Sequence, residues 1–207
     1  MCEAKLYEAI FFDFDGVLAD SEPVHFESWR EALQPVGIQL DWTRFAKYCI
    51  GVPDRDAVEL LCRLNPTPID VEVAWAQRDL KGELFAAHML RVPPFSDEVI
   101  ELVKSLSAYK LAVVTASSRQ DIEPLLERAG IRSCFAALVC RDDVTRNKPA
   151  PDPYLLAARL VAVSQALVVE DSEPGAASGA AAGFDVLRVL SPTAVPRMVR
   201  ERLGNFR

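Results

Sequence analysis

The sequence predicts an α/β fold with a parallel β-sheet at its core and a helical lobe inserted after the first strand. Short apolar runs that are typical of buried strands alternate with amphipathic helical segments over most of the chain. Residues 22–90 differ, because they contain helical patterns and no strand pattern. The stretch RVPPF at 91–95 then ends the lobe, since consecutive prolines cannot continue a helix. We therefore predict a core domain over 1–16 and 92–207 and a helical domain over 17–91.

Predicted strands and helices alternate within the core. The apolar runs predict strands over 9–14, 110–116, 135–140, 166–171 and 185–190. The segments between them predict helices over 96–106, 118–130, 152–163 and 174–183. Ser96 is a candidate N-cap, and Gly130 is a candidate for the position that follows a helix end. This alternation favours a parallel sheet that helices cover on both faces.

Composition and charge narrow the classes of partner and compartment. Half of the 207 residues are apolar, and the net charge of −7 disfavours nucleic acid and anionic membrane surfaces as partners. No apolar run reaches the ~20 residues that a membrane span needs, and we expect no secretory signal. The five cysteines form no CxxC pair, which favours free thiols in a reducing compartment and hence a cytoplasmic protein. We expect a monomer.

Polar side chains gather at the ends of the predicted strands or just before a helix that follows one. Because the carboxyl ends of parallel strands lie at one edge of a sheet, we expect these side chains to converge there. They are Asp13 and Asp15, Thr115, Lys148, and Glu170 with Asp171. Three or four carboxylates in one small site need a cation to neutralise them. Oxygen ligands with open positions suit Mg²⁺, which keeps waters and takes phosphate oxygens.

The pair Asp13 and Asp15 has a chemical use in such a site. One carboxylate can attack phosphorus while the other handles the proton, and a phosphoaspartate divides a difficult hydrolysis into two easier steps. Lys148 and Thr115 supply a positive charge and a hydroxyl donor for the phosphoryl oxygens. The residues thus predict a site where Mg²⁺ and a phosphate group meet.

Four stretches, DFDGVLADSE, VVTASS, KPAPDPY and VVEDSEPG, resemble in this order the four motifs of the haloacid dehalogenase superfamily. The resemblance spans nearly the whole chain. It implies a Rossmann-like core with an inserted α-helical cap domain, similar to the subfamily of β-phosphoglucomutase and phosphoglycolate phosphatase. It also implies that Asp13 is the nucleophile and a Mg²⁺ ligand. Asp15 would protonate the leaving oxygen, then activate water, and would bind Mg²⁺ through its carbonyl oxygen.

The same resemblance implies roles for residues of the other three motifs. Thr115 and Lys148 would hold the phosphoryl oxygens, Asp171 would bind the metal, and Glu170 would support the metal site. From the residues alone, Glu170 is equally well explained as a charge at a helix N-terminus. Ala116, Ser117 and Arg119 follow Thr115 and are candidates for contact with substrate, although Ser117 and Arg119 are also explained as capping or exposed groups.

The cap would set specificity, and the resemblance suggests four residues there. His25 resembles a histidine near the proton-handling aspartate, Gly51 and Arg55 lie in a stretch that resembles the substrate-recognition loop, and Lys81 matches a cap lysine. Three of these residues also have a plainer explanation. His25 is also explained as a residue on a helix face, Arg55 as a partner of Asp54 or Asp56, and Lys81 as a solvated helix lysine.

The predicted function is Mg²⁺-dependent hydrolysis of a small phosphorylated metabolite of the sugar phosphate or phosphoglycolate type. Two alternatives remain. A phosphomutase similar to β-phosphoglucomutase would pass the phosphoryl group to a sugar, but Ile50 stands where that enzyme has a lysine. A non-catalytic module would only accept phosphate on an aspartate, as receiver domains do, but the inserted lobe and Asp15 favour an enzyme.

Overall fold

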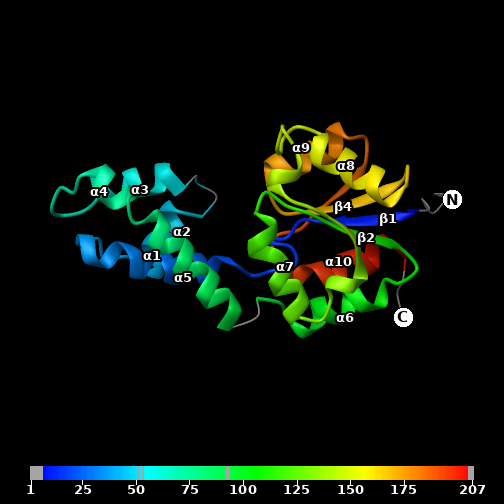
Figure 1. Cartoon of the computed structure of the whole chain (residues 1–207), viewed down its shortest axis with the longest axis horizontal. Coiled ribbons are helices and arrows are strands. Elements are labelled where there is room, and N and C mark those ends of the chain that lie inside the picture. Colours follow the sequence, from blue (N-terminus) through cyan, green and yellow to red (C-terminus); the bar gives the residue numbers. More distant parts are fainter. Residues whose placement is uncertain (1–6, 51, 53, 92–93, 205–207) are drawn as a thin grey trace. The chain divides into compact units, whose positions relative to one another are not determined.

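The computed structural model describes residues 7–50, 52, 54–91 and 94–204. The chain folds into two compact units, one of Met1–Asp20 with Pro93–Arg207 and one of Ser21–Val92, here called the α/β unit and the helical unit (Figure 1). The sequence prediction placed the first change of unit after residue 16, whereas in the structure it follows Asp20.

A five-stranded parallel sheet forms the centre of the α/β unit. Its strands are β1 (Ala9–Phe12), β2 (Lys110–Val114), β3 (Phe135–Val139), β4 (Ala166–Glu170) and β5 (Asp185–Arg188). They lie in the order β3-β2-β1-β4-β5, and Phe11 of β1 is in register with Ala112 of β2 and Val168 of β4. The predicted parallel α/β fold is therefore confirmed, with β1 in the middle of the sheet. Each strand ends one to two residues before its predicted end.

Helices cover both faces of this sheet, as Figure 1 shows. They are α6 (Asp97–Ser105), α7 (Arg119–Arg128), α8 (Asp152–Val161), α9 (Glu173–Ala181) and α10 (Val195–Arg202). Ser96 caps α6 by accepting a hydrogen bond from the backbone N–H of Val99 (3.3 Å), as its position predicts. Helix α10 was not predicted, because its buried apolar side chains form only a narrow stripe among arginines. Short 3₁₀ turns occupy Gln34–Val36, Arg132–Cys134, Arg141–Asp143 and Pro192–Ala194.

Apolar side chains on one face of the sheet form a core with α8. Phe11, Val114 and Val168 of the strands pack with Tyr154 and Ala157 of α8, and all five are fully buried. Phe11 and Tyr154 stack with ring centroids 6.5 Å apart. Burying such side chains stabilises a fold by roughly 1.5–3 kcal/mol each, which makes this face a rigid base for the loops at the strand ends.

The helical unit has its own core. It consists of α1 (Glu22–Leu33), α2 (Trp42–Tyr48), α3 (Asp54–Arg63), α4 (Val71–Trp75) and α5 (Arg78–Arg91). Trp29, Leu33, Phe45 and Leu61 are buried together between these helices. Asp41 caps α2 through the backbone N–H of Arg44, and Asp70 caps α4 through that of Glu72 (both 2.8 Å). Within the described ranges, no helix combines the length and apolarity needed to cross a membrane.

Candidate active site

The polar residues predicted at the strand ends lie on three neighbouring strands. Asp13 directly follows β1, Thr115 follows β2, and Glu170 ends β4. The backbone ladder continues past the strands, because the N–H of Asp13 donates to the carbonyl of Val169 (3.0 Å) and that of Thr115 donates to Val139 (2.9 Å). These bonds fix the backbone of both residues. Parallel sheets bind their ligands at the carboxyl ends of their strands, and these residues lie at those ends of the central strand β1 and of β2 and β4 on either side of it.

Lys148 joins all three of these strand ends. Its ammonium donates to Asp13 Oδ1 at 2.8 Å, to Glu170 Oε1 at 2.6 Å and to the carbonyl oxygen of Val114 at 2.9 Å. The side chain is only 8% exposed, so water screens these contacts weakly. The lysine comes from the loop before α8, far along the chain from Asp13, as the KPAPDPY motif implied.

Glu170 is fully buried and accepts hydrogen bonds on both carboxylate oxygens. Oε1 accepts from Lys148 and from the hydroxyl of Tyr154 (2.8 Å), while Oε2 accepts from the hydroxyl of Ser172 (3.0 Å) and from its N–H (3.3 Å). Gly175 leaves room for this carboxylate, since a Cβ there would lie 1.8 Å from Oε1. These contacts hold Glu170 in one orientation and exceed what a charge at a helix N-terminus alone would need.

Asp15 lies in a tight turn after Asp13 and is linked to β2 through Ser117. The Ser117 hydroxyl donates to Asp15 Oδ2 at 2.8 Å, and the Ser117 N–H donates to Thr115 Oγ1 at 3.0 Å. Asp15 is half-buried, whereas Thr115 is buried. Ser117 therefore contacts two predicted catalytic residues, which gives it a defined place in the site.

Three carboxylates lie close enough to hold one metal ion. Oxygen atoms of Asp13, Glu170 and Asp171 all lie within 4.8 Å of one another. Gly16 leaves room for Asp171, because its φ of +73° suits glycine and a Cβ there would lie 2.1 Å from Asp171 Oδ2. An all-carboxylate donor set is the kind that Mg²⁺ takes. The residues present therefore fit this cation.

The electrostatics of the cluster also favour a cation. Burial raises the pKa of Asp13 to about 8, with the charges of Glu170 and Asp15 adding to the rise and Lys148 opposing it. Burial, followed by the charge of Glu170, raises the pKa of Asp171. Burial alone would lower the pKa of Lys148, but the attraction of Asp13 and Glu170 outweighs it and raises that pKa. The single positive charge of Lys148 does not balance the carboxylates of the cluster. A divalent ion would supply the missing positive charge and favour their ionised forms.

Two further residues predicted beside Thr115 have different surroundings. Ala116 is exposed and has no polar side chain. The guanidinium of Arg119 donates to the carbonyl oxygen of Leu138 and to Asp143 Oδ2, both at 2.8 Å. Arg119 therefore ties α7 to the end of β3 and to the turn that follows it.

The residues predicted in the lobe lie in the helical unit, and two of them meet. Lys81 Nζ lies 3.0 Å from Nδ1 of His25, and Lys81 is buried, unlike the solvated lysine that was the plainer explanation. Arg55 pairs with Glu59 and Glu72, not with the neighbouring aspartates, and lies over the ring of Trp75. Gly51 lies outside the described residues.

Sequence reasoning missed Tyr154 and Ser172, which both contact Glu170. Tyr154 closes the KPAPDPY stretch, and Ser172 lies in VVEDSEPG, so both were inside recognised motifs. The one available signal was their position in those motifs, since a tyrosine in an apolar helix is also explained as core packing. Burial and the charge of Glu170 raise the pKa of Tyr154 well above its ordinary value, so it remains a hydrogen-bond donor.

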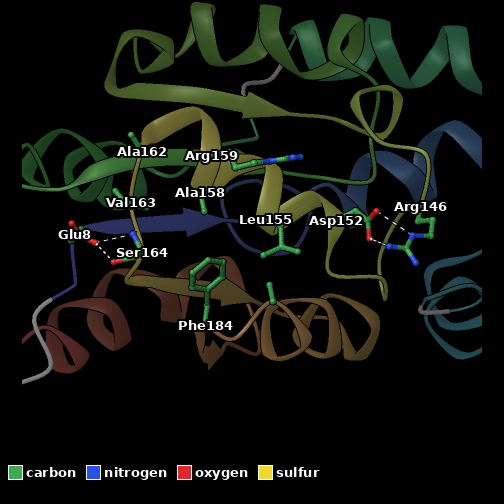
Figure 2. A pocket seen from close by; sticks show the side chains of 11 residues that line it. Glu8, Arg146, Asp152, Leu155, Ala158, Arg159, Ala162, Val163, Ser164 and Phe184 are labelled. Carbon is green, nitrogen blue, oxygen red and sulfur yellow. Dashed lines mark hydrogen bonds and ion pairs between the residues drawn. The ribbon is translucent and has the colours of Figure 1, made fainter.

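Figure 2 shows a hollow of about 860 Å³ elsewhere on the α/β unit, beside α8. At one end, Glu8 accepts hydrogen bonds from the backbone N–H groups of Ser164 and Gln165, and at the other Arg146 pairs with Asp152. None of the residues predicted for catalysis or metal binding lines this hollow.

Comparison with known proteins agrees with the geometry of the strand ends. Residues 7–183 match the model of the haloacid dehalogenase-like hydrolases. The chain belongs to this family. The hydrolase is 33% identical to fructose-1-phosphate phosphatase YqaB of Escherichia coli over 88% of its own length and 96% of that protein. It is 31% identical to the phosphorylated carbohydrates phosphatase of Thermotoga maritima over 86% and 82% of the two chains.

A solved structure shares both the fold and part of the sequence. CbbY of Rhodobacter sphaeroides, crystallised in complex with phosphate, is 27% identical to this hydrolase with a TM-score of 0.66, over 89% of this chain and 88% of that one. The family prediction from the four motifs is therefore confirmed.

Proposed function

We propose that this hydrolase is a Mg²⁺-dependent phosphatase that cleaves a phosphorylated sugar through a phosphoaspartate on Asp13. The observation that carries the proposal is the shared position of Lys148 between Asp13 and Glu170, with Asp171 in the same cluster. A lysine and an excess of buried carboxylates around a single nucleophile suit a reaction in which negative charge must be held while phosphorus is attacked.

The first half of the reaction forms the phosphoaspartate. A carboxylate oxygen of Asp13 attacks phosphorus, and the bond between phosphorus and the sugar oxygen breaks. Asp15 gives its proton to that departing oxygen, so the sugar leaves as a neutral hydroxyl compound. Lys148 and the Thr115 hydroxyl bind the phosphoryl oxygens and hold phosphorus in line with Asp13.

The second half releases inorganic phosphate. Asp15, now ionised, takes a proton from a water molecule, whose oxygen attacks phosphorus. The bond between phosphorus and Asp13 then breaks, which restores both aspartates to their starting states. Ser117 donates to Asp15 at 2.8 Å and so sets the direction in which Asp15 presents its free oxygen.

Asp13, Asp171 and Glu170 would hold the Mg²⁺, with Asp15 contributing its carbonyl oxygen. When bound, the ion supplies positive charge to the phosphoryl oxygens. We assign the helical unit the role of a cap that sets specificity, with His25, Arg55, Lys81 and Gly51 as its candidates for contact with the substrate. Ala116 and Arg119 remain candidates beside Thr115.

The proposed substrate class is a sugar phosphate, because both curated relatives described above are named for phosphorylated carbohydrates. Hydrolysis is preferred to mutase action because Ile50 replaces the lysine that the resemblance to β-phosphoglucomutase would require.

We place the enzyme in the cytoplasm, since Cys49, Cys62, Cys134 and Cys140 are free. Since one chain supplies every proposed catalytic group, we propose a monomer.

A panel of phosphorylated metabolites tests the proposal. With Mg²⁺, wild type should release phosphate from fructose 1-phosphate and other sugar phosphates, and EDTA should stop the release. Asp13→Asn should lower kcat by at least about 10⁴-fold. The matched control is Asp142→Asn, a change at an exposed aspartate, which should leave kcat unchanged. Phosphate release that persists in Asp13→Asn, or glucose 6-phosphate formed from β-glucose 1-phosphate, would contradict the proposal.

A further inference from the structure

An arginine at the end of β5 reaches the short segment that carries Asp171. This segment, residues 171–172, joins β4 to α9. The N–H of Val189 donates to the carbonyl oxygen of Glu170 at 2.8 Å, which extends the pairing of β4 and β5 to the residue before Asp171. The guanidinium of Arg188 then donates to the carbonyl oxygen of Asp171 itself at 2.6 Å. The edge strand β5 therefore holds the main chain of Asp171 through a side chain.

The main chain and the carboxylate of Asp171 are held by different elements. The carboxylate lies against the turn after β1, where a Cβ on Gly16 would lie 2.1 Å from Oδ2. One of its oxygens is within 4.8 Å of oxygens of Asp13 and Glu170. The carbonyl oxygen is bound by Arg188 of β5. Since the rotamers open to a side chain depend on its backbone angles, a fixed carbonyl favours one direction for the carboxylate.

Arg188 has a second acceptor, which contributes less. Its guanidinium also donates to Glu173 Oε2 at 3.0 Å. The Glu173 side chain is 90% exposed, and ion pairs that water surrounds add little to stability. A hydrogen bond from a charged donor to the carbonyl of Asp171 is the stronger of the two contacts. The sequence gave no sign of it, because an arginine at the end of an edge strand is usually explained as a solvated charge.

We propose that Arg188 is a positioning residue for the Mg²⁺ site. By holding the carbonyl of Asp171, it keeps the carboxylate of that residue in the cluster with Asp13 and Glu170. Arg188 is not a ligand itself, because a guanidinium has no acceptor atom. That Asp171 binds Mg²⁺ rests on the proposed function, whereas the contact between Arg188 and Asp171 does not.

Mg²⁺ titration of the metal-free full chain by calorimetry tests the proposal, because charge and position predict opposite results for Arg188→Met. Loss of the charge alone would tighten Mg²⁺ binding, since a nearby positive charge repels the ion. Loss of the hydrogen bond should instead weaken binding by about tenfold. Arg197→Met is the matched control. It removes the same charge from a side chain that is 70% exposed and pairs with Glu201 of its own helix, so it should bind Mg²⁺ as wild type does.

The result for wild type separates this proposal from the proposed function. No Mg²⁺ binding by wild type would overturn the metal site of the proposed function together with this proposal. Mg²⁺ binding that is equal or tighter in Arg188→Met than in wild type would overturn the role of Arg188 alone. Should Arg188→Met not fold, the same outcomes apply to Arg188→Val, whose β-branched side chain suits a strand.

Three further variants test whether Arg188 acts through Asp171. Arg188→Lys keeps the charge and a donor, and should recover part of the Mg²⁺ affinity that Arg188→Met loses. Glu173→Gln removes the charge of the other acceptor and should bind Mg²⁺ as wild type does. Arg188→Met combined with Asp171→Asn should bind no more weakly than Asp171→Asn, because both changes affect the same ligand. Multiplied losses in the double variant would overturn the proposal.

Discussion

Among the residues that the structure describes, Lys148 in the α/β unit and Lys81 in the helical unit both have side chains almost shielded from solvent, and they differ in the charge around them. Lys148 in the α/β unit touches two carboxylates, and a third belongs to the same cluster. Lys81 in the helical unit touches one carboxylate, one imidazole and two aromatic rings. Both side chains are at most 10% exposed. Only around Lys148 is negative charge in excess.

This difference separates two kinds of polar cluster. Around Lys81, one positive charge balances one negative charge, so the cluster needs nothing further and can serve to orient a side chain. Around Lys148, burial together with the charge of Glu170 raises the pKa of Asp13 and of Asp171, and a divalent ion would stabilise their ionised forms. A cluster with unbalanced buried charge is therefore the better candidate for a metal and phosphate site.

Replacing each lysine should give the largest measurable difference between the two clusters. In metal-free protein, Lys148→Met should lower the free energy of unfolding by about 3–5 kcal/mol, because it leaves buried carboxylates without a partner. Lys81→Met should lower it by only about 1 kcal/mol, because the Asp54 side chain is 52% exposed and water can hydrate it. Urea denaturation of both variants measures this. Equal losses, or a larger loss for Lys81→Met, would contradict the comparison.

The pH dependence of stability tests whether the carboxylates around Lys148 are destabilised by their surroundings. The pKa of Asp13 is about 8 in the folded protein and near 3.8 when unfolded, so between these values the folded state binds more protons. The stability that Asp13 contributes is therefore greatest at low pH and is lost as pH rises toward 8. Metal-free Asp13→Asn lacks this loss, so its stability relative to wild type should increase by about 3–4 kcal/mol from pH 5 to pH 8.

Denaturation of both proteins in EDTA at several pH values tests this expectation. Asp142→Asn serves as the control, because that carboxylate is 67% exposed, and its difference from wild type should not change with pH. A difference between Asp13→Asn and wild type that is constant from pH 5 to pH 8 would show that Asp13 is not destabilised by its surroundings.

The smallest expected effect concerns Ser117. Ser117→Ala removes the hydroxyl that donates to Asp15 and should lower kcat about tenfold, while the free energy of unfolding changes by no more than about 1 kcal/mol. Ser105→Ala, which removes a hydroxyl bonded to its own helix, should leave kcat unchanged. An unchanged kcat in Ser117→Ala would mean that Asp15 is oriented by other groups.

The sequence predicted the residues whose place follows from topology. Asp13, Thr115 and Glu170 sit at strand ends, and the rule for parallel sheets brings those ends together without knowledge of any side-chain contact. Lys148 was expected near the same edge because it precedes the helix that leads to β4, but its contacts with both Asp13 and Glu170 depend on the path of a loop that no local pattern fixes. For the same reason the hydrogen bonds of Tyr154 and Ser172 to Glu170 were not predictable.

The helical unit was less predictable. The amphipathic patterns indicated its helices, but the burial of Lys81 depends on three helices that meet in space. On a helix, a lysine beside charged neighbours is indistinguishable in sequence from a solvated one. Only the packing of Trp29, Phe85 and Asp54 around it reveals that its charge is held inside the unit.

The most direct test of the account is calorimetric titration of Mg²⁺ into wild type, Asp171→Asn and Glu173→Gln. Wild type should bind one ion per chain. Asp171→Asn should weaken that binding at least about tenfold, as loss of a charged ligand requires. Glu173→Gln, at a side chain that is 90% exposed in the neighbouring helix turn, should bind as wild type does. Undiminished Mg²⁺ binding by Asp171→Asn, or none by wild type, would contradict the central claim that the carboxylates after β1 and β4 share one ion.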